Sequence, residues 1–348
     1  MKRAREDDPP RRLRVAILGD AFVDVQVGGV DALPRWGADV SCSSVKLMPG
    51  GSAGNTARQL GGLALAEMEA SFFSCVGGDE AGAHYVQTLE AEGVLASPRQ
   101  TLHVLADAPQ SCCVILSGPA DRAMCSCYET VHRVRVELFA EALAGDASAS
   151  SDSSSSSAAP WSLVHIGGYF NCIGLHSEAL LQLVKALRAR GALVSLDPQH
   201  DCSGKWSGEG GHLSSLLPLL DIFMPNEVEI VKITGAPTPE AALDQLSAAH
   251  PELLVVMTLG ASGLRAARGG RRWTTGAMRV ARFVDATGAG DAAGAGFLVQ
   301  YLRDKSDVEL ALRWAAAAGA LCVSQSGACS APLRSAQVAA ALAAGEVA

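Results

Sequence analysis

Short apolar runs alternate with longer amphipathic stretches along most of the chain. Runs that are apolar throughout are typical of strands buried on both faces of a parallel sheet. Because stretches with helical spacing lie between them, the pattern indicates an α/β sandwich with a mostly parallel central sheet. We predict strands at Leu13–Gly19, Ser71–Gly77, Leu163–Gly167, Ala192–Leu196, Ile222–Pro225 and Leu253–Leu259, and helices at Gly54–Leu63, Asp79–Glu92, Ser177–Arg190 and Pro239–Ala249.

Two segments interrupt this alternation. Ala21–Lys46 and Gln110–Tyr128 have the pattern of antiparallel ribbons, and Ser117–Asp121 has turn composition. We expect them to form a small β-strand lid from about residues 21–48 and 109–130. The serine-rich stretch 145–160 cannot bury apolar area, so it is expected to be a flexible insertion. Residues 1–12 are expected to be a disordered leader, and residues 13–348 a single domain.

The charge balance excludes some classes of partner. The chain has 28 Lys and Arg against 36 Asp and Glu, a net charge of −8, and no basic stripe. We therefore expect no nucleic-acid partner and no membrane-surface partner. No apolar run reaches the roughly 18 residues of a membrane span. The ten cysteines lack zinc-like spacing, so they are expected to be reduced thiols of a cytoplasmic protein.

The sharpest chemical signal is the glycine-rich stretch Asp285–Gly296. It follows a strand-like run, Val280–Val284, and leads into a helical run, Ala292–Leu302. At such a turn the N–H groups of Gly288, Ala289 and Gly290 would form an anion hole, with the helix dipole behind them. Asp291 beside this hole would act as general base for a phosphoryl acceptor. The alternative is a tight glycine turn in which Asp291 is only an N-cap.

A second glycine cluster, Gly50–Ala57, also precedes a helix. Gly50 and Gly51 would let the backbone approach a polyol, and Asn55 offers both a donor and an acceptor to hydroxyl groups. Asp24, after the first strand, could accept two hydroxyl hydrogen bonds. Taken alone, this cluster is equally well explained as a capped helix.

These two clusters together resemble the signatures of the PfkB family of carbohydrate and nucleoside kinases. The resemblance spans roughly Val15 to Pro332. Gly50–Asn55 looks like the N-terminal signature, and Asp285–Phe297 looks like the C-terminal one, with Asp291 at the catalytic base. The resemblance implies a ribokinase-like three-layer sandwich with a β-strand lid. It also implies transfer of a phosphoryl group from ATP.

Intermediate segments carry further implied roles. Pro225–Glu229 resembles the family's P-N-E-x-E element, which places Asn226 near the phosphates and Glu229 near Mg²⁺, through water. Thr258 and Gly260 resemble the step that lines the nucleotide. The resemblance also implies a monovalent cation, K⁺ by analogy with many members, and a homodimer formed through the lid. The residues implied at the cation are Asp285, Thr287, Gly327 and Ser330.

The acceptor is less well defined. We expect a hydroxyl of a small sugar or sugar acid, held by Asp24, Gly50, Gly51 and Asn55. Phe22 stands where ribokinases carry an asparagine, so a nucleoside kinase of the same fold is the first alternative. The second is a catalytically dead interaction protein. Arg122 could reach an anionic group of a substrate, or could simply be an exposed turn residue. Tyr169 could line the cleft or belong to the core.

Overall fold

The computed structural model describes residues 12–118, 122–144, 160–325 and 329–347. Residues 1–11 of the predicted leader and residues 145–159 of the serine-rich insertion lie outside these ranges. So do residues 119–121 of the predicted lid turn. Within the described ranges, no helix is long and apolar enough to cross a membrane.

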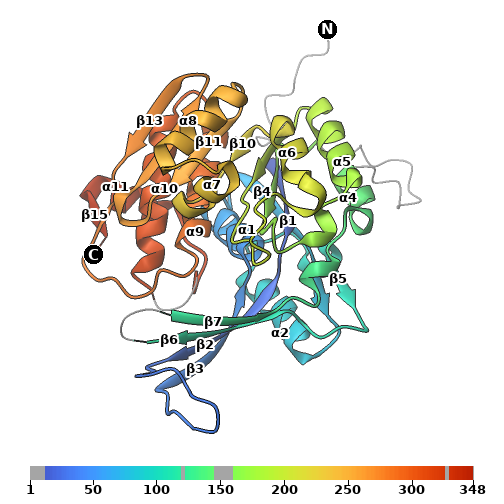
Figure 1. Ribbon diagram of the computed structural model, residues 1–348, viewed down its shortest axis with the longest axis vertical. Helices are drawn as coiled ribbons and strands as arrows, with labels where there is room; N and C mark the ends of the chain where they lie inside the picture. Colours follow the sequence, from blue (N-terminus) through green and yellow to red (C-terminus); the bar gives the residue numbers. More distant parts are fainter. Residues whose placement is uncertain (1–11, 119–121, 145–159, 326–328, 348) are drawn as a thin grey trace.

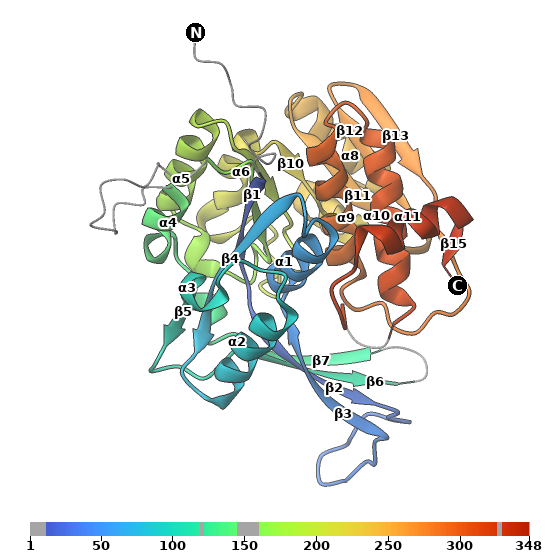
Figure 2. The same ribbon diagram turned by 180° about the vertical axis from the view of Figure 1, so that it is seen from behind.

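The centre of the molecule is a nine-stranded sheet in the order β13-β12-β11-β10-β9-β8-β1-β4-β5 (Figures 1 and 2). All neighbours from β5 to β11 pair parallel, and β12 pairs antiparallel with both β11 and β13. The strands are β1 (Leu13–Gly19), β4 (Met68–Gly77), β5 (Leu102–Leu105), β8 (Leu163–Gly167), β9 (Leu193–Leu196), β10 (Ile222–Phe223), β11 (Leu254–Thr258), β12 (Leu264–Arg268) and β13 (Arg271–Thr275).

Two apolar cores lie on the two faces of this sheet. Successive side chains of a strand point to opposite faces, so Val15 and Ile17 of β1 enter one core while Ala16 and Leu18 enter the other. The first core contains α1 (Ser52–Leu63), α2 (Glu80–Glu92), α9 (Ala289–Arg303), α10 (Val308–Val323) and α11 (Ser335–Ala344). The second contains α4 (Ala140–Ala144), α5 (Glu178–Ala189), α6 (His212–Leu216), α7 (Glu227–Thr234) and α8 (Pro239–Ala249). The short α3 (Pro98–Thr101) leads into β5. The three-layer prediction is confirmed.

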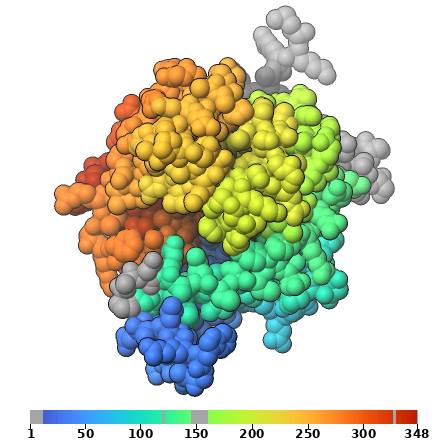
Figure 3. Space-filling model, in the orientation of Figure 1, coloured from blue at the N-terminus to red at the C-terminus, as the bar shows by residue number. Residues whose placement is uncertain are grey.

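The lid is a separate four-stranded sheet in the order β3-β2-β6-β7. It projects below the body in the space-filling view, in blue and green (Figure 3). Its strands are β2 (Phe22–Gly28), β3 (Ser44–Gly50), β6 (Cys112–Ser117) and β7 (Arg122–Cys127). The register places Asp24, Gln26 and Arg122 on one face of the lid. Val45 and Leu47, which are 60% and 57% exposed, lie on the other face.

One predicted strand is wrong in extent. Only Arg279–Val280 (β14) is a strand in the region predicted as Val280–Val284, and it pairs with β15 (Glu346–Val347) at the C-terminus. Residues 281–284 are exposed and are not part of a strand, although the Ala281 N–H still donates to the Val347 carbonyl of β15 at 2.9 Å. An apolar run by itself therefore misled the prediction. Ile222–Pro225 likewise shortens to β10, and Met224 and Pro225 connect this strand to α7.

Candidate active site

The candidate site lies above the carboxyl ends of the parallel strands, where ligands bind in open α/β sheets. In the sheet β1 lies between β4 and β8. Because the chain continues from β1 to β4 on one side and adds β8 later on the other, the strand order reverses at β1 and the crevice opens beside it. The N-terminus of α1 fills this crevice. A Cβ on Gly19 would lie 2.7 Å from the Cβ of Ala53, so only glycine allows the helix to sit so close.

The first glycine cluster is packed against two buried carboxylates. Gly51 is the N-cap of α1 and has a φ of 87°, a conformation that suits glycine. A Cβ on Gly50 would lie 2.3 Å from the carboxyl carbon of Asp24. The glycines therefore bring the β3–α1 turn against Asp24, which is 5% exposed. The structure brings together Asp24, Gly50, Gly51 and Asn55, as predicted for an acceptor site.

Asp20 belongs to the same cluster, and the sequence analysis assigned it no role. Its carboxylate accepts hydrogen bonds from the Ala53 N–H and the Asn171 side chain, both at 2.8 Å. It is therefore an anchor for the start of α1. The signal that could have revealed it is its place directly after a buried strand, where a charged residue needs hydrogen-bonding partners.

Asp291 lies in the first turn of α9. The helix begins at Ala289 with Gly288 as its N-cap, so the reading of Asp291 as the N-cap is wrong. The Asn55 amide donates to Asp291 Oδ2 at 2.9 Å and so joins two glycine clusters 236 residues apart. The Gln199 amide lies 3.4 Å from the other carboxylate oxygen, Oδ1.

The predicted anion hole also lies at this helix start. Helices leave their first N–H groups without intrahelical partners. The Ala289 N–H donates to the Ala286 carbonyl at 3.2 Å. Those of Gly290 and Asp291 have no backbone acceptor among the described residues. A Cβ on Gly290 would meet no atom within 4 Å. The start of α9 is therefore open toward the cleft.

Several buried carboxylates share this cleft and raise one another's pKa. Burial raises the pKa of Asp291 to about 7, against the hydrogen bond from Asn55, which lowers it. Burial, and then the charge of Asp291, raise the pKa of Asp24 to about 7. Burial also raises the pKa of Glu229 to about 7 and that of Asp197 well above its ordinary value. Such a cluster is an environment that favours a bound cation.

Glu229 and Asn226 form a capping box at the start of α7. The Asn226 side chain accepts from the N–H groups of Val228 and Glu229, both at 2.9 Å. The Asn226 N–H and amide donate to the two Glu229 oxygens at 2.9 and 2.6 Å. Thr258 lies beside Asn226 through a parallel bridge, and Gly260 follows it with a φ of 52°. The predicted nucleotide residues are thus adjacent.

The oxygen-rich donor set suits Mg²⁺, which prefers oxygen ligands and keeps several waters. No group of three or more His, Cys, Asp or Glu side chains among the described residues has the geometry of a complete metal site. Glu229, the residue implied at Mg²⁺, and the neighbouring Asp197 would supply carboxylate oxygens to the waters of such an ion.

The lid reaches the loop before α9 through Arg122. Its guanidinium donates to the Thr287 hydroxyl at 2.6 Å and lies 3.8 Å from the Asp285 carboxylate. Asp285 in turn accepts from the Thr287 N–H at 2.8 Å. Of the other residues expected at a monovalent cation, Ser330 donates to Gln325 at 2.9 Å, and Gly327 lies outside the described residues.

Two residues with open roles are buried in the core. Phe22 is 5% exposed, and its ring lies edge-on to Tyr128 at a centroid distance of 5.4 Å. Tyr169 is fully buried, and its hydroxyl lies 2.9 Å from His212 Nδ1. The first contact is aromatic packing and the second is a hydrogen bond within the core.

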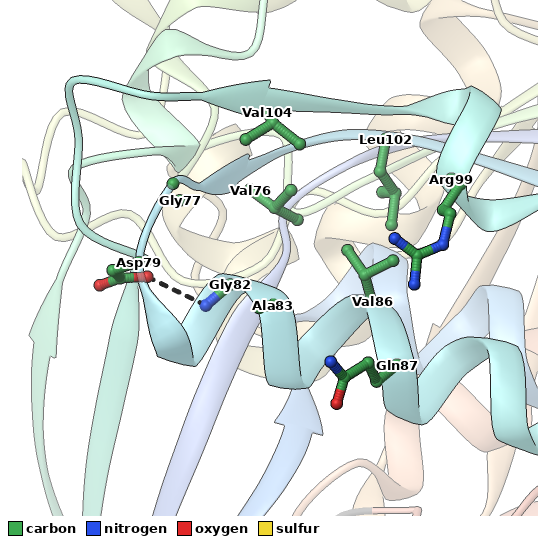
Figure 4. Close-up of a pocket in the computed structure, with 11 residues that line it drawn as sticks. Val76, Gly77, Asp79, Gly82, Ala83, Val86, Gln87, Arg99, Leu102 and Val104 are labelled. Atoms are coloured by element: carbon green, nitrogen blue, oxygen red, sulfur yellow. Dashed lines mark hydrogen bonds between the residues drawn. The ribbon is translucent and has the colours of Figure 1, made fainter.

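A cavity coincides with the predicted phosphate side. It has a volume of about 40 Å³ and is lined in part by Asp197, Gln199, Asn226, Glu229 and Gly290. A larger cavity, of about 330 Å³, lies between α2 and β5 (Figure 4). There Asp79 caps α2, and Arg99 forms an ion pair with Glu90. None of the predicted site residues lines it, so the smaller cleft is the better candidate.

The family model described as pfkB family carbohydrate kinase matches residues 14–335. The chain belongs to this family. The match covers the body, the lid and both glycine clusters, so the pfkB resemblance drawn from the two signatures is confirmed.

Curated relatives of this pfkB chain include kinases of sugars and of a sugar phosphate. The ribokinase of Arabidopsis thaliana is 34% identical over 156 residues, which is 42% of this chain and 38% of the plant protein. The chain thus aligns with less than two fifths of that ribokinase. An ATP-dependent ribose-1-phosphate kinase of Halopiger xanaduensis is 26% identical over 332 residues, 92% of this chain and 95% of the relative.

Solved structures of similar fold include both sugar and nucleoside kinases. Arabidopsis thaliana ribokinase, complexed with ribose and ATP, has a TM-score of 0.74 at 23% identity and covers 95% of this chain and 99% of its own. A Burkholderia thailandensis nucleoside kinase, in complex with inosine, has a TM-score of 0.72 at 19% identity, with 95% and 97% covered. At these identities the likeness shows the fold of the pfkB chain.

Proposed function

We propose that this protein transfers the γ-phosphoryl group of ATP to a hydroxyl of a small sugar or sugar acid, with Asp291 as general base. The observation that carries the proposal is the hydrogen bond from Asn55 to Asp291, 2.9 Å long. It joins the cluster suited to polyol binding to the helix start suited to anion binding.

Asp24 and Asn55 would hold the acceptor. The Asn55 side-chain oxygen is buried and has no hydrogen-bond partner among the described residues, and the same holds for the Gln26 amide nitrogen. An unpaired buried polar atom is costly, so both atoms are suited to pair with a polar ligand. Together with the Asp24 carboxylate they offer donors and acceptors to a polyhydroxylated molecule.

Asp291 would take the proton of the attacking hydroxyl. The first-turn N–H groups of α9, with Gly288 and Gly290 beside them, would stabilise the charge of the transferred phosphoryl. Asn226, Thr258 and Gly260 would lie along the nucleotide. Mg²⁺, held near Glu229, would supply charge neutralisation on the phosphates. A K⁺ ion near Asp285, Thr287, Gly327 and Ser330 is proposed from the family resemblance.

A measurement of ADP release with Mg-ATP and K⁺ tests this function. The acceptors are ribose, deoxyribose, fructose, 2-keto-3-deoxygluconate, adenosine and inosine, with ribose 1-phosphate added because a relative acts on it. We expect one strong sugar-type acceptor and a loss of about 10²–10⁴-fold in kcat for Asp291→Asn, the usual contribution of a general base. Near-normal turnover of Asp291→Asn would refute the role of this residue.

The nucleoside kinase remains the second candidate, and the same assay separates the two. A structural relative binds inosine, whereas Phe22, the residue that made this alternative the first one, is packed against Tyr128. Saturable turnover with adenosine or inosine and none with free sugars would replace our first choice. ATP binding without turnover on any acceptor would favour the non-enzymatic alternative.

We also propose that the lid forms a homodimer. Its outer face exposes Val45 and Leu47 of β3. Across the strands, Val45 pairs with Val27 of β2 and Leu47 pairs with Val25. Exposed apolar sheet faces and open strand edges are often covered by association. Light scattering should give about twice the 35.9 kDa chain mass, and Leu47→Lys should return the chain mass. A monomer at all concentrations would contradict this proposal.

A further inference from the structure

Gln199 is the residue of the site that the family signatures leave without a role. It follows β9 at the carboxyl end of the sheet, two residues after Asp197. It also lines the same small cleft as Asn226, Glu229 and Gly290. The side chain therefore belongs to the region where the phosphoryl group would be transferred.

The contacts of Gln199 link two buried carboxylates. Its amide nitrogen, Nε2, lies 3.2 Å from Asp197 Oδ1 and 3.4 Å from Asp291 Oδ1. Because an amide nitrogen carries two hydrogens, it can donate one to each carboxylate. The Asn55 amide meanwhile donates to Asp291 Oδ2 at 2.9 Å. Two amides thus face the two oxygens of Asp291.

The backbone conformation of Gln199 indicates that its side chain has a function in these contacts. Its φ is 58°, in the left-handed region that glycine adopts freely and other residues rarely enter. Its N–H donates to Asp197 Oδ1 at 3.1 Å, which holds the turn in place. Strained non-glycine residues cluster at functional sites. A glycine would fit this turn without strain, so the glutamine side chain needs an explanation beyond the turn.

We propose that Gln199 is a positioning residue that, together with Asn55, clamps the Asp291 carboxylate in the orientation required for proton transfer. Only the lone pairs not engaged by the two amides would then remain for the acceptor hydroxyl. The proposal rests on the proposed kinase function and adds to it a residue from the turn after β9. Asp197 would act through Gln199, because it holds both the N–H and the amide of that residue.

Two variants separate positioning from structure. Gln199→Leu keeps the bulk of the side chain and removes its amide. Gln199→Gly removes the amide and relieves the left-handed strain, so its Tm should be equal to or higher than that of the wild type. Gln182→Leu, on the exposed face of α5, is a matched control in which an amide pairs with Glu178 far from the site.

With the best acceptor from the ADP-release panel, both Gln199 variants should lower kcat roughly tenfold, within the range for disturbed general-base geometry. The KM for ATP and for the acceptor should change less than about twofold, since Gln199 contacts neither in this proposal. The acid limb of the kcat profile should move to higher pH, because a donor to ionised Asp291 is lost. Of the neighbouring acids, Asp20, Asp24 and Glu229 keep their surroundings in both variants. Asp197 loses the amide donor of Gln199 but keeps the N–H of residue 199.

The outcomes distinguish this inference from the function on which it rests. A wild type with no transfer to any acceptor would overturn both. The positioning role alone would be overturned if the wild type turns over, Asp291→Asn is inactive, and Gln199→Gly has the same kcat as the wild type. If Gln199→Leu lowers both kcat and Tm while Gln199→Gly keeps full activity, Gln199 has a packing role only. Loss of kcat in both variants with Tm retained would support the clamp.

Discussion

The two glycine clusters meet at one site but use glycine for different reasons. At Gly50 and Gly51 an added Cβ would collide with the protein itself, 2.3 Å from the Asp24 carboxyl group and 2.6 Å from the Asp20 carbonyl. At Gly290 it would meet nothing within 4 Å. The first cluster is thus needed to pack the chain, and the second leaves space that a ligand would fill. Sequence patterns alone make the two look alike.

The strongest test of this contrast is Gly290→Ala. Since alanine is the better helix former and meets no atom, the free energy of unfolding should stay equal or rise by up to about 1 kcal/mol. Turnover should fall by roughly 100-fold or more, because a methyl group would stand where the transferred phosphoryl approaches the helix start. Urea unfolding and ADP release measure the two effects. Normal turnover would place the phosphoryl elsewhere.

Gly50→Ala should show the opposite pattern. The new Cβ would overlap the buried Asp24 carboxylate, and overpacking of this kind costs about 1–3 kcal/mol of unfolding free energy. Any loss of turnover should follow from displacement of Asp24 and appear mainly in the KM of the acceptor. Urea unfolding of both glycine variants in parallel gives the comparison. Equal stability of the two variants would remove the distinction between the clusters.

A further effect is expected from pH. Asp291 and Asp24 each have a pKa raised to about 7. A base must be ionised, so kcat/KM should fall as the pH drops through 7, by roughly tenfold for each further unit if one group controls it. The pKa of each group is higher in the folded chain than in the unfolded chain. The folded state therefore holds more protons, and stability should rise on acidification from about pH 7 to 4.

A flat rate profile between pH 6 and 8 would contradict this view of the acceptor cluster. The control variant is Asp24→Asn, which removes the carboxylate whose pKa the charge of Asp291 raises and should lower the midpoint of the acid limb. The stability profile can be followed in the same samples by thermal unfolding.

Most of the fold could be predicted because strong local patterns decided it. Leu13–Gly19 and Leu163–Gly167 are strands with the predicted bounds, since both are mostly apolar and most of their residues are buried. Pro239–Ala249 is a helix with the predicted bounds, since Thr238 caps it and proline suits its first turn. The hairpin β12–β13 was missed because Arg265, Arg268, Arg271 and Arg272 make it polar, as an edge of the sheet allows.

The site was predicted in part for the same reason. Gly50, Asn55 and Asp291 belong to compact motifs that can be read locally. Asp20, Asp197 and Gln199 are single polar residues after strands, and their contacts with α1 and α9 depend on which strands become neighbours. Only the three-dimensional arrangement places Gln199 within reach of Asp291. Long-range pairing of this kind leaves no signal in a local pattern.

The position of β1 in the sheet affects the order in which the domain can fold during its synthesis. This strand is made first, yet its two neighbours, β4 and β8, follow much later, and from β8 onward each strand up to β13 adds to the growing edge in chain order. Domains generally fold as units, and α1 packs against α9, which is made near the end of the chain. The half around α1 therefore stays incompletely packed during translation until α9 emerges. A nascent chain that stops before residue 289 would lack both the proposed base and the helix against which α1 packs.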